Sequence, residues 1–177
     1  MALLEISGLK TYFPIRSGVL SRHLGNVKAV DGVTLNVEDR ETLGLVGESG
    51  CGKSTLGRSV LRLIEPTEGQ IIFEEREILS LGHSEMRDMR RRMQIIFQDP
   101  YASLNPRMRV GEIVGEGLKI HGLASGQKRR DITMQILDRV GLREEHYERY
   151  PHEFSGGQRQ RIGVARALIF RPRLIIA

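Results

Sequence analysis

The chain has 177 residues, of which 40% are hydrophobic and 28% charged, and its formal net charge is +5. These values predict one globular domain or most of one, and the single cysteine, Cys51, excludes a protein held together by intrachain disulfides. No window approaches about eighteen consecutive apolar residues, and Glu5 interrupts the first apolar run, so we expect neither a transmembrane helix nor a signal peptide. The composition therefore predicts a protein that is made and kept in the cytosol.

The first informative run along the chain is Gly47 to Thr55, which reads GESGCGKST and fits the pattern G-x-x-x-x-G-K-S. Its glycines let the backbone turn so that successive N–H groups converge on a phosphate. Lys53 adds a cation for the β and γ oxygens, and Ser54 offers a hydroxyl to the Mg²⁺ that bridges them. The predicted ATP-binding residues are Gly47, Glu48, Ser49, Gly50, Cys51, Gly52, Lys53, Ser54 and Thr55.

The flanks of this run agree with a phosphate loop, which follows a strand and opens a helix. Residues 42–46 are mostly apolar and predict a buried parallel strand. Residues 54–65 have apolar positions at roughly helical spacing and predict a helix that Pro66 ends. The helix N-terminus would then point at the phosphates. We assign no role to Cys51, because a small residue that merely fits the loop explains it.

A second motif, Ser155 to Gln158, reads SGGQ and precedes a run with helical apolar spacing over 160–168. Ser155 is a predicted helix N-cap, and a serine hydroxyl with two glycine amides at a helix start forms an anion site. Taken alone this pattern is weak, because serine and glycine commonly begin helices for structural reasons.

The two motifs in this order resemble the ATP-binding-cassette family. In that family two nucleotide-binding domains pack head to tail, and the signature of one covers the γ-phosphate held by the other. The resemblance implies that Ser155, Gly156, Gly157 and Gln158 act in trans, in a homo- or heterodimer. It also implies ATP and Mg²⁺ as cofactors.

The same resemblance implies an α/β fold: a P-loop NTPase cassette with an N-terminal antiparallel β part, a RecA-like core and a helical subdomain. We expect residues 1–177 to form a single incomplete domain. Residues 1–98 would hold the β subdomain and the phosphate-loop core. Residues from about 99 to 170 would hold the helical subdomain with the signature, and 171–177 would begin the Walker B strand.

Two further positions match the family's order along the chain. Tyr12 resembles the aromatic residue that stacks on adenine, with Phe13 as its close competitor; an aromatic residue of an N-terminal sheet is the alternative for both. Gln98 follows a strand-like run over 93–97 and resembles the glutamine that contacts Mg²⁺ and the attacking water. A plain turn residue is the alternative for Gln98. Ser54 and Gln98 are the implied Mg²⁺ contacts.

Three segments resemble the ATPases of bacterial dipeptide, oligopeptide and nickel importers. They are FQDPYASLNP over 97–106, YPHEFS over 150–155, and the long connection between 13–16 and 27–30. The resemblance implies a second cassette subunit, transmembrane permease subunits and, indirectly, a substrate-binding protein as partners. It places the chain on the inner face of the cell membrane, where ATP binding and hydrolysis would drive transport.

The last residues, 171–177, resemble the run-up to the family's second nucleotide strand, after which an aspartate and a catalytic glutamate normally follow. Neither is present within the chain, and no histidine lies at the place of the family's switch histidine. A general base contributes about 10²–10⁴ in rate, so we expect this chain to be hydrolysis-deficient. The last strand would also lack neighbours that the rest of a cassette supplies, so we expect the chain to be marginally folded and aggregation-prone.

Two other interpretations of the sequence stay open. The basic clusters Arg87 with 90–92 and 128–130 suit a nucleic-acid ligand, but no aromatic residues interleave with them, and a solvated helix face or a phospholipid-facing surface explains them equally well. We expect no nucleic-acid partner. The alternative functions are a soluble cassette ATPase that acts on nucleic acid or the ribosome, and a non-catalytic product of a truncated gene.

Overall fold

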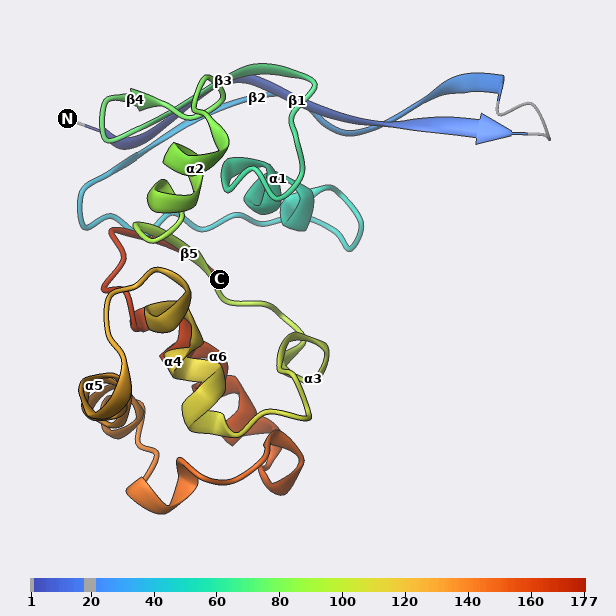
Figure 1. Cartoon of the computed structure of the whole chain (residues 1–177). Helices are drawn as coiled ribbons and strands as arrows, with labels where there is room; N and C mark the ends of the chain where they lie inside the picture. The colour runs from blue at the N-terminus through green and yellow to red at the C-terminus, as the bar shows by residue number, and fades with distance from the viewer. Residues whose placement is uncertain (1, 18–21) are drawn as a thin grey trace. The chain divides into compact units, whose positions relative to one another are not determined.

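The computed structural model describes residues 2–17 and 22–177 of the chain (Figure 1). The chain divides into two compact units, Met1–Arg87 and Asp88–Ala177. We call them the N-terminal unit and the C-terminal unit, and each is described by itself.

An antiparallel sheet of four strands forms the N-terminal unit, in the order β2-β1-β3-β4. Strands β1 (Ala2–Ser17) and β2 (Arg22–Glu38) form a long twisted hairpin, as Figure 1 shows in blue. Strands β3 (Glu68–Phe73) and β4 (Arg76–Glu77) continue the sheet beyond β1. The expected N-terminal antiparallel β part is confirmed.

The burial of β1 shows why this segment is a strand. Leu4, Ile6, Leu9 and Thr11 are all buried, with a period of two that shifts by one residue at Gly8. Gly8 has φ +56°, and the pairing of β1 with β2 changes register between Ile6 and Leu9. A bulge at Gly8 therefore keeps both halves of the strand facing the same core.

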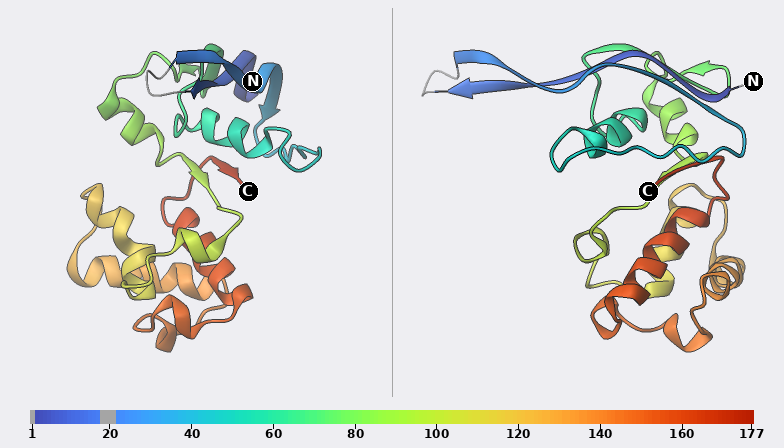
Figure 2. Two further views of the ribbon diagram at one scale, coloured as in Figure 1. Left: turned by 90° about the vertical axis from the view of Figure 1, so that its right-hand side faces the viewer. Right: turned by 180° about the vertical axis from the view of Figure 1, so that it is seen from behind.

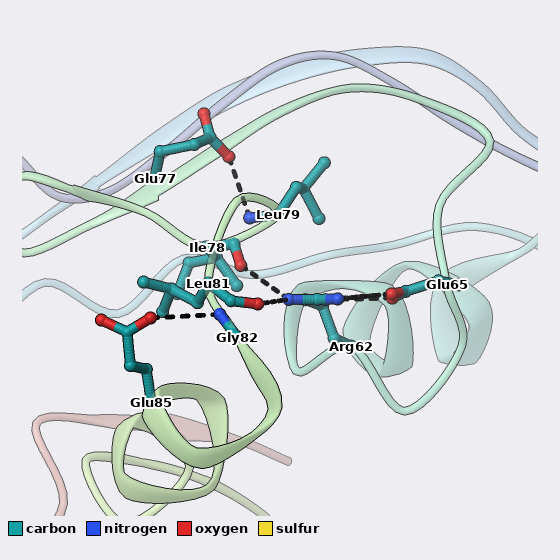
Figure 3. Close-up of polar contacts among 8 residues, drawn as sticks. All are labelled: Arg62, Glu65, Glu77, Ile78, Leu79, Leu81, Gly82 and Glu85. Carbon is teal, nitrogen blue, oxygen red and sulfur yellow. Dashed lines mark hydrogen bonds and ion pairs between the residues drawn. The ribbon is translucent and has the colours of Figure 1, made fainter.

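Helix α1 (Lys53–Val60) follows the phosphate loop and lies against the sheet. It is shorter than the predicted 54–65 helix. The chain leaves the helix at Leu61, and Arg62 adopts φ +48°. Figure 3 shows the reason: the Arg62 guanidinium donates to the carbonyl oxygens of Ile78 and Leu81, at 3.0 and 2.9 Å, and also binds Glu65. These contacts favour the turn over another helical turn.

The prediction of a buried strand over 42–46 is wrong. These residues form no strand, and Leu43, Leu45 and Val46 are exposed, Val46 to 92%. A strand is stable only when a neighbouring strand pairs with its backbone. No strand among the described residues pairs with this segment.

Helix α2 (His83–Met89) begins with a bond from the Gly82 N–H to the Glu85 carboxylate, at 3.1 Å (Figure 3). Met86 and Met89 are buried while Arg87 is exposed, so the helix is amphipathic.

Six helical segments and a small parallel sheet form the C-terminal unit (Figure 2). Strand β5 (Met93–Ile95) pairs in parallel with β6 (Leu174–Ile176), and this β6 lies in the 171–177 run where a strand was expected. The helical segments are α3 (Pro100–Ser103), α4 (Val110–Ile120), α5 (Gly126–Arg139), η1 (Glu144–His146), η2 (Pro151–Glu153) and α6 (Gly156–Leu168). The helices expected between residues about 99 and 170 are confirmed.

The core of the C-terminal unit packs α4, α5 and α6 around fully buried apolar side chains that include Val114, Leu137 and Ile162. Glycine permits the closest contacts. An added Cβ at Gly111 would lie 2.3 Å from the Tyr147 ring, so an alanine at this position would force the two segments apart. Gly141, with φ +74°, ends α5 just after its C-cap residue Val140.

Candidate nucleotide-binding site

The phosphate loop is closed by the lysine of its own motif. Lys53 Nζ donates to the carbonyl oxygens of Gly47 and Glu48, each at 2.7 Å, and lies 3.5 Å from Cys51 Sγ. The ammonium group therefore lies across the loop, where it can meet phosphate oxygens. The whole of 41–51 is exposed, so a ligand can reach the loop from solvent.

Gly52 cannot be replaced without moving the loop. Its φ is +99°, and an added Cβ would lie 2.1 Å from the carbonyl oxygen of Ala29 in β2. This contact places the start of α1 directly beside the sheet. Both the backbone conformation and the close approach require glycine.

The N-terminus of α1 suits an anion. The N-cap residue is Gly52, and no side chain caps the helix, so the first N–H groups have no capping partner. Uncapped N–H groups, the helix dipole and the Lys53 ammonium together favour phosphate oxygens. These features fit a nucleotide triphosphate with its Mg²⁺, for which the exposed Ser54 hydroxyl is a ligand of suitable chemistry. Among the described residues, no group of three or more His, Cys, Asp or Glu side chains forms a metal site without a nucleotide.

Tyr12 lies on β1, in the same unit as this loop. Its neighbour Thr11 shares a buried hydrogen bond of 2.9 Å with Ser59 of α1, which fixes the strand to the helix. The Tyr12 hydroxyl donates to Asp31 of β2. Phe13, the competitor for adenine, pairs with Val27 further along the hairpin and is 40% exposed. Of the two aromatic residues, Tyr12 is the one next to the residue bonded to α1.

The signature residues begin α6, as predicted. Ser155 Oγ accepts from the Gln158 N–H at 3.3 Å, and Gln158 Oε1 accepts from the Ser155 N–H at 3.0 Å. This reciprocal capping box confirms Ser155 as the N-cap. Ser155, Gly156 and Gly157 are exposed, so they are available to a ligand or a partner.

A buried arginine, Arg159, which was not among the predicted site residues, supports the segment that precedes the signature. Arg159 Nε donates to the carbonyl oxygen of Pro151 at 2.9 Å, and Nη2 donates to that of Phe154 at 2.5 Å. Its guanidinium carbon also lies 3.7 Å from the centroid of the Tyr101 ring. Since Phe154 directly precedes Ser155, these bonds fix the backbone conformation immediately before the signature.

A second arginine of α6 reaches the same α3 segment. Arg166 Nη1 donates to the carbonyl oxygen of Ser103 at 2.5 Å, and burial lowers the pKa of Arg166. Arg159 and Arg166 thus tie α6 to both ends of α3. Sequence reasoning missed both because arginine inside a helix usually faces solvent.

Gln98 lies three residues after β5 and is exposed. The next residue, Asp99, caps α3 by accepting from the N–H groups of Tyr101 and Ala102, at 2.8 and 3.2 Å. Gln98 therefore lies at a defined turn between a strand and a capped helix. The structure places Gln98 and the signature in the C-terminal unit, whereas Tyr12 and the phosphate loop belong to the N-terminal unit.

Many basic side chains already have partners within the chain. Glu148 accepts from both Arg109 and Arg130, the latter at 2.9 Å. Arg62 pairs with Glu65, and Arg76 pairs with Glu85 at 2.9 Å. These ion pairs cancel charge locally and leave the net charge of +5 unchanged. No helix in the described part of the chain is long and apolar enough to cross a membrane.

The glycine-rich loop at a helix N-terminus, the antiparallel sheet beside it and the serine-capped SGGQ helix define a P-loop nucleotide-binding domain of the cassette type. The family model described as ABC transporter matches residues 30–177. The chain belongs to this family.

Curated relatives match nearly the whole chain. The oligopeptide transport ATP-binding protein AppF of Bacillus subtilis is 52% identical over 176 residues, which are 99% of this chain and 54% of that protein. OppF of the same organism, also an oligopeptide transport ATP-binding protein, is 54% identical over 99% of this chain and 56% of its own length. The glutathione import ATP-binding protein GsiA of Salmonella paratyphi A is 53% identical over 99% of this chain and 28% of its length. The chain thus spans about half of the first two relatives and less of GsiA.

Solved structures agree on the fold. The ATP-binding cassette MJ0796, in a dimeric post-hydrolysis state bound to ADP and Pi, has a TM-score of 0.84 at 28% identity, over 97% of this chain and 72% of its own. The cbiO1 protein of Clostridium perfringens has a TM-score of 0.75 at 24% identity, over 98% of this chain and 64% of its own. The expected cassette fold is confirmed.

Proposed function

We propose that this chain is the ATP-binding, energy-coupling part of a bacterial importer for peptides. The observation that carries the proposal is the phosphate loop, in which Lys53 lies across an uncapped helix N-terminus. The relatives with oligopeptide and glutathione import in their names support the transported class. Nickel is the alternative substrate that the sequence resemblance left open.

In this proposal the residues of the loop hold Mg²⁺-ATP. Lys53 and the N–H groups of α1 bind the phosphates, Ser54 binds the Mg²⁺, and Tyr12 stacks on the adenine. Gln98 contacts the Mg²⁺ and the attacking water. When bound, Mg²⁺ neutralises charge on the phosphate oxygens.

The signature acts in trans in this proposal. Ser155 and the two glycines that follow it are exposed at a helix N-terminus, which suits the γ-phosphate held by a second cassette. The partners are a second cassette subunit, identical or not, and transmembrane permease subunits at the inner face of the membrane.

We also propose that the chain is a single incomplete domain with three parts, which are residues 1–98, about 99–170 and 171–177.

Equilibrium binding of Mg²⁺-ATP to the purified chain tests the proposal, with the Lys53→Met variant as the critical comparison. Removing the ammonium group should weaken ATP binding by about tenfold or more, since a charge-assisted hydrogen bond contributes about 1.5–3 kcal/mol. Lys128→Met removes an exposed lysine of α5 and serves as the matched control. Equal ATP affinity of all three proteins would contradict the proposal.

Steady-state turnover on the same preparations tests the expectation that residues 1–177 hydrolyse ATP slowly. That expectation stays a prediction, and ordinary cassette turnover by the chain would contradict it. Co-purification with permease subunits, as opposed to nucleic acid or ribosomes, distinguishes the importer from a soluble cassette ATPase. No contact among residues 2–17 and 22–177 favours the nucleic-acid alternative.

A further inference from the structure

Three side chains on the β1–β2 hairpin form a closed set of contacts around the Tyr12 ring. The Tyr12 hydroxyl donates to Asp31 Oδ1, and Lys28 Nζ donates to Asp31 Oδ2 at 3.2 Å. Lys28 Nζ also lies 5.4 Å from the centroid of the Tyr12 ring. Tyr12 pairs with Lys28 across the two strands, so the sheet itself brings these groups together.

The charges of these groups reinforce the contacts. The hydrogen bond from Tyr12, followed by that from Lys28, lowers the pKa of Asp31 below its ordinary value. The hydrogen bond to Asp31 raises the pKa of Tyr12 and also that of Lys28. Near neutral pH the set therefore consists of a carboxylate, a neutral phenol and an ammonium group, which is the combination that gives charge-assisted hydrogen bonds.

The strands that carry the set approach α1 close to it. An added Cβ at Gly52, the N-cap residue of α1, would lie 2.1 Å from the carbonyl oxygen of Ala29, which follows Lys28. Thr11, which precedes Tyr12, is bonded to Ser59 of α1. The set is therefore one residue away, along each strand, from a contact with the helix that follows the phosphate loop.

We propose that Asp31 is a positioning residue that fixes the Tyr12 ring for the nucleobase, and that Lys28 occupies one face of that ring. The base then stacks on the opposite face. An anchored ring loses no rotamer freedom when the nucleotide binds, so the anchor strengthens binding without touching the ligand. This inference rests on the proposed function and adds to it the residues that orient the base platform.

A purely structural role for Asp31 makes a different prediction. If Asp31 only holds the hairpin together, its loss changes stability and affects every ligand of the loop alike. If Asp31 positions Tyr12, its loss affects only ligands that carry a base. Inorganic tripolyphosphate, which has the phosphates but no base, is the probe that separates the two roles.

The experiment measures the affinities of Mg²⁺-ATP and Mg²⁺-tripolyphosphate for the whole chain and its variants. We expect Asp31→Ala to weaken ATP about three- to tenfold, the range for ordering one side chain on binding, and to leave tripolyphosphate within about twofold. Tyr12→Phe removes the hydroxyl but keeps the ring and should have the same effect. The double variant should be no weaker than either single variant, because both remove one contact.

Two further variants complete the test. Asp31→Asn keeps an oxygen that can accept from Tyr12, so it should recover part of the ATP affinity. Glu68→Ala breaks the 2.6 Å ion pair with Lys10 on the same sheet and should change neither affinity. If Asp31→Ala does not fold, Tyr12→Phe tests the same contact without removing a charge.

Several outcomes would overturn the inference. If Asp31→Ala or Tyr12→Phe weakens the binding of both ligands equally, the contact has only a structural role. If these variants weaken the binding of neither ligand, the contact has no role in binding. A wild-type chain that binds tripolyphosphate as tightly as ATP shows that no base is recognised, which refutes this inference and leaves phosphate binding intact. A wild-type chain that binds neither ligand refutes the proposed function itself.

Discussion

The phosphate loop and the signature both lie at helix N-termini, yet the chain supports them in different ways. The loop is exposed over 41–51, and its preceding segment pairs with no described strand. The signature lies on a helix whose inner face belongs to a packed core, and the buried Arg159 holds the residues before it. A motif's conformation can thus come from local backbone chemistry or from tertiary packing.

The two regions should therefore respond differently to substitutions. The loop depends on glycine conformation and on Lys53, so changes there should remove ligand binding and leave the fold intact. The signature depends on α6 and its arginines, so changes beneath it should affect stability first.

Gly52→Ala tests the loop. The new Cβ would collide with the Ala29 carbonyl oxygen at 2.1 Å, in a backbone with φ +99°. We expect ATP affinity to fall by about 100-fold or more, equivalent to about 2.7 kcal/mol, with the circular dichroism spectrum unchanged. Gly44→Ala is the matched control, because a Cβ there meets nothing within 4 Å. Normal binding by Gly52→Ala would refute the close contact.

Arg159→Met tests the support of the signature. It removes two hydrogen bonds from a buried guanidinium and leaves the carbonyls of Pro151 and Phe154 without that donor. We expect a loss of about 2–4 kcal/mol in unfolding free energy, measured by urea titration. Gln160→Met, at an exposed position of the same helix, should change stability by less than about 0.5 kcal/mol. Equal urea midpoints for the two variants would show that Arg159 does not stabilise the segment that precedes the signature.

Acid should weaken the C-terminal unit slightly. Hydrogen bonds from Arg130 and Arg109 lower the pKa of Glu148 below its ordinary value of 4.5. A carboxyl whose folded pKa is lowered contributes stability above its unfolded pKa, and this is lost as the pH falls through the folded value. Unfolding followed from pH 7 to pH 3 should show a smaller acid loss in Glu148→Gln than in wild type. The effect is small because Glu148 is about half exposed, at 49%. Identical pH profiles would show that the network contributes nothing.

The sequence predicted the local conformation of the two motifs better than the structure around them. Glycine at 52 and serine at 155 are required by local rules for positive φ and for capping, and the structure confirms both conformations. The strand over 42–46 was predicted from its apolar composition alone. It fails because composition cannot supply a pairing partner.

The class of this protein follows from local motifs: a phosphate loop, an SGGQ helix cap and their order define a cassette, since each depends on backbone chemistry within a few residues. The contacts that support those motifs became visible in the folded chain. In the structure Asp31 accepts hydrogen bonds from Tyr12 and Lys28, and the buried Arg159 donates to the carbonyl oxygen of Pro151, just before the signature. These contacts join residues whose side chains give no local signal of burial or partnership, because strand pairing and helix packing bring them together.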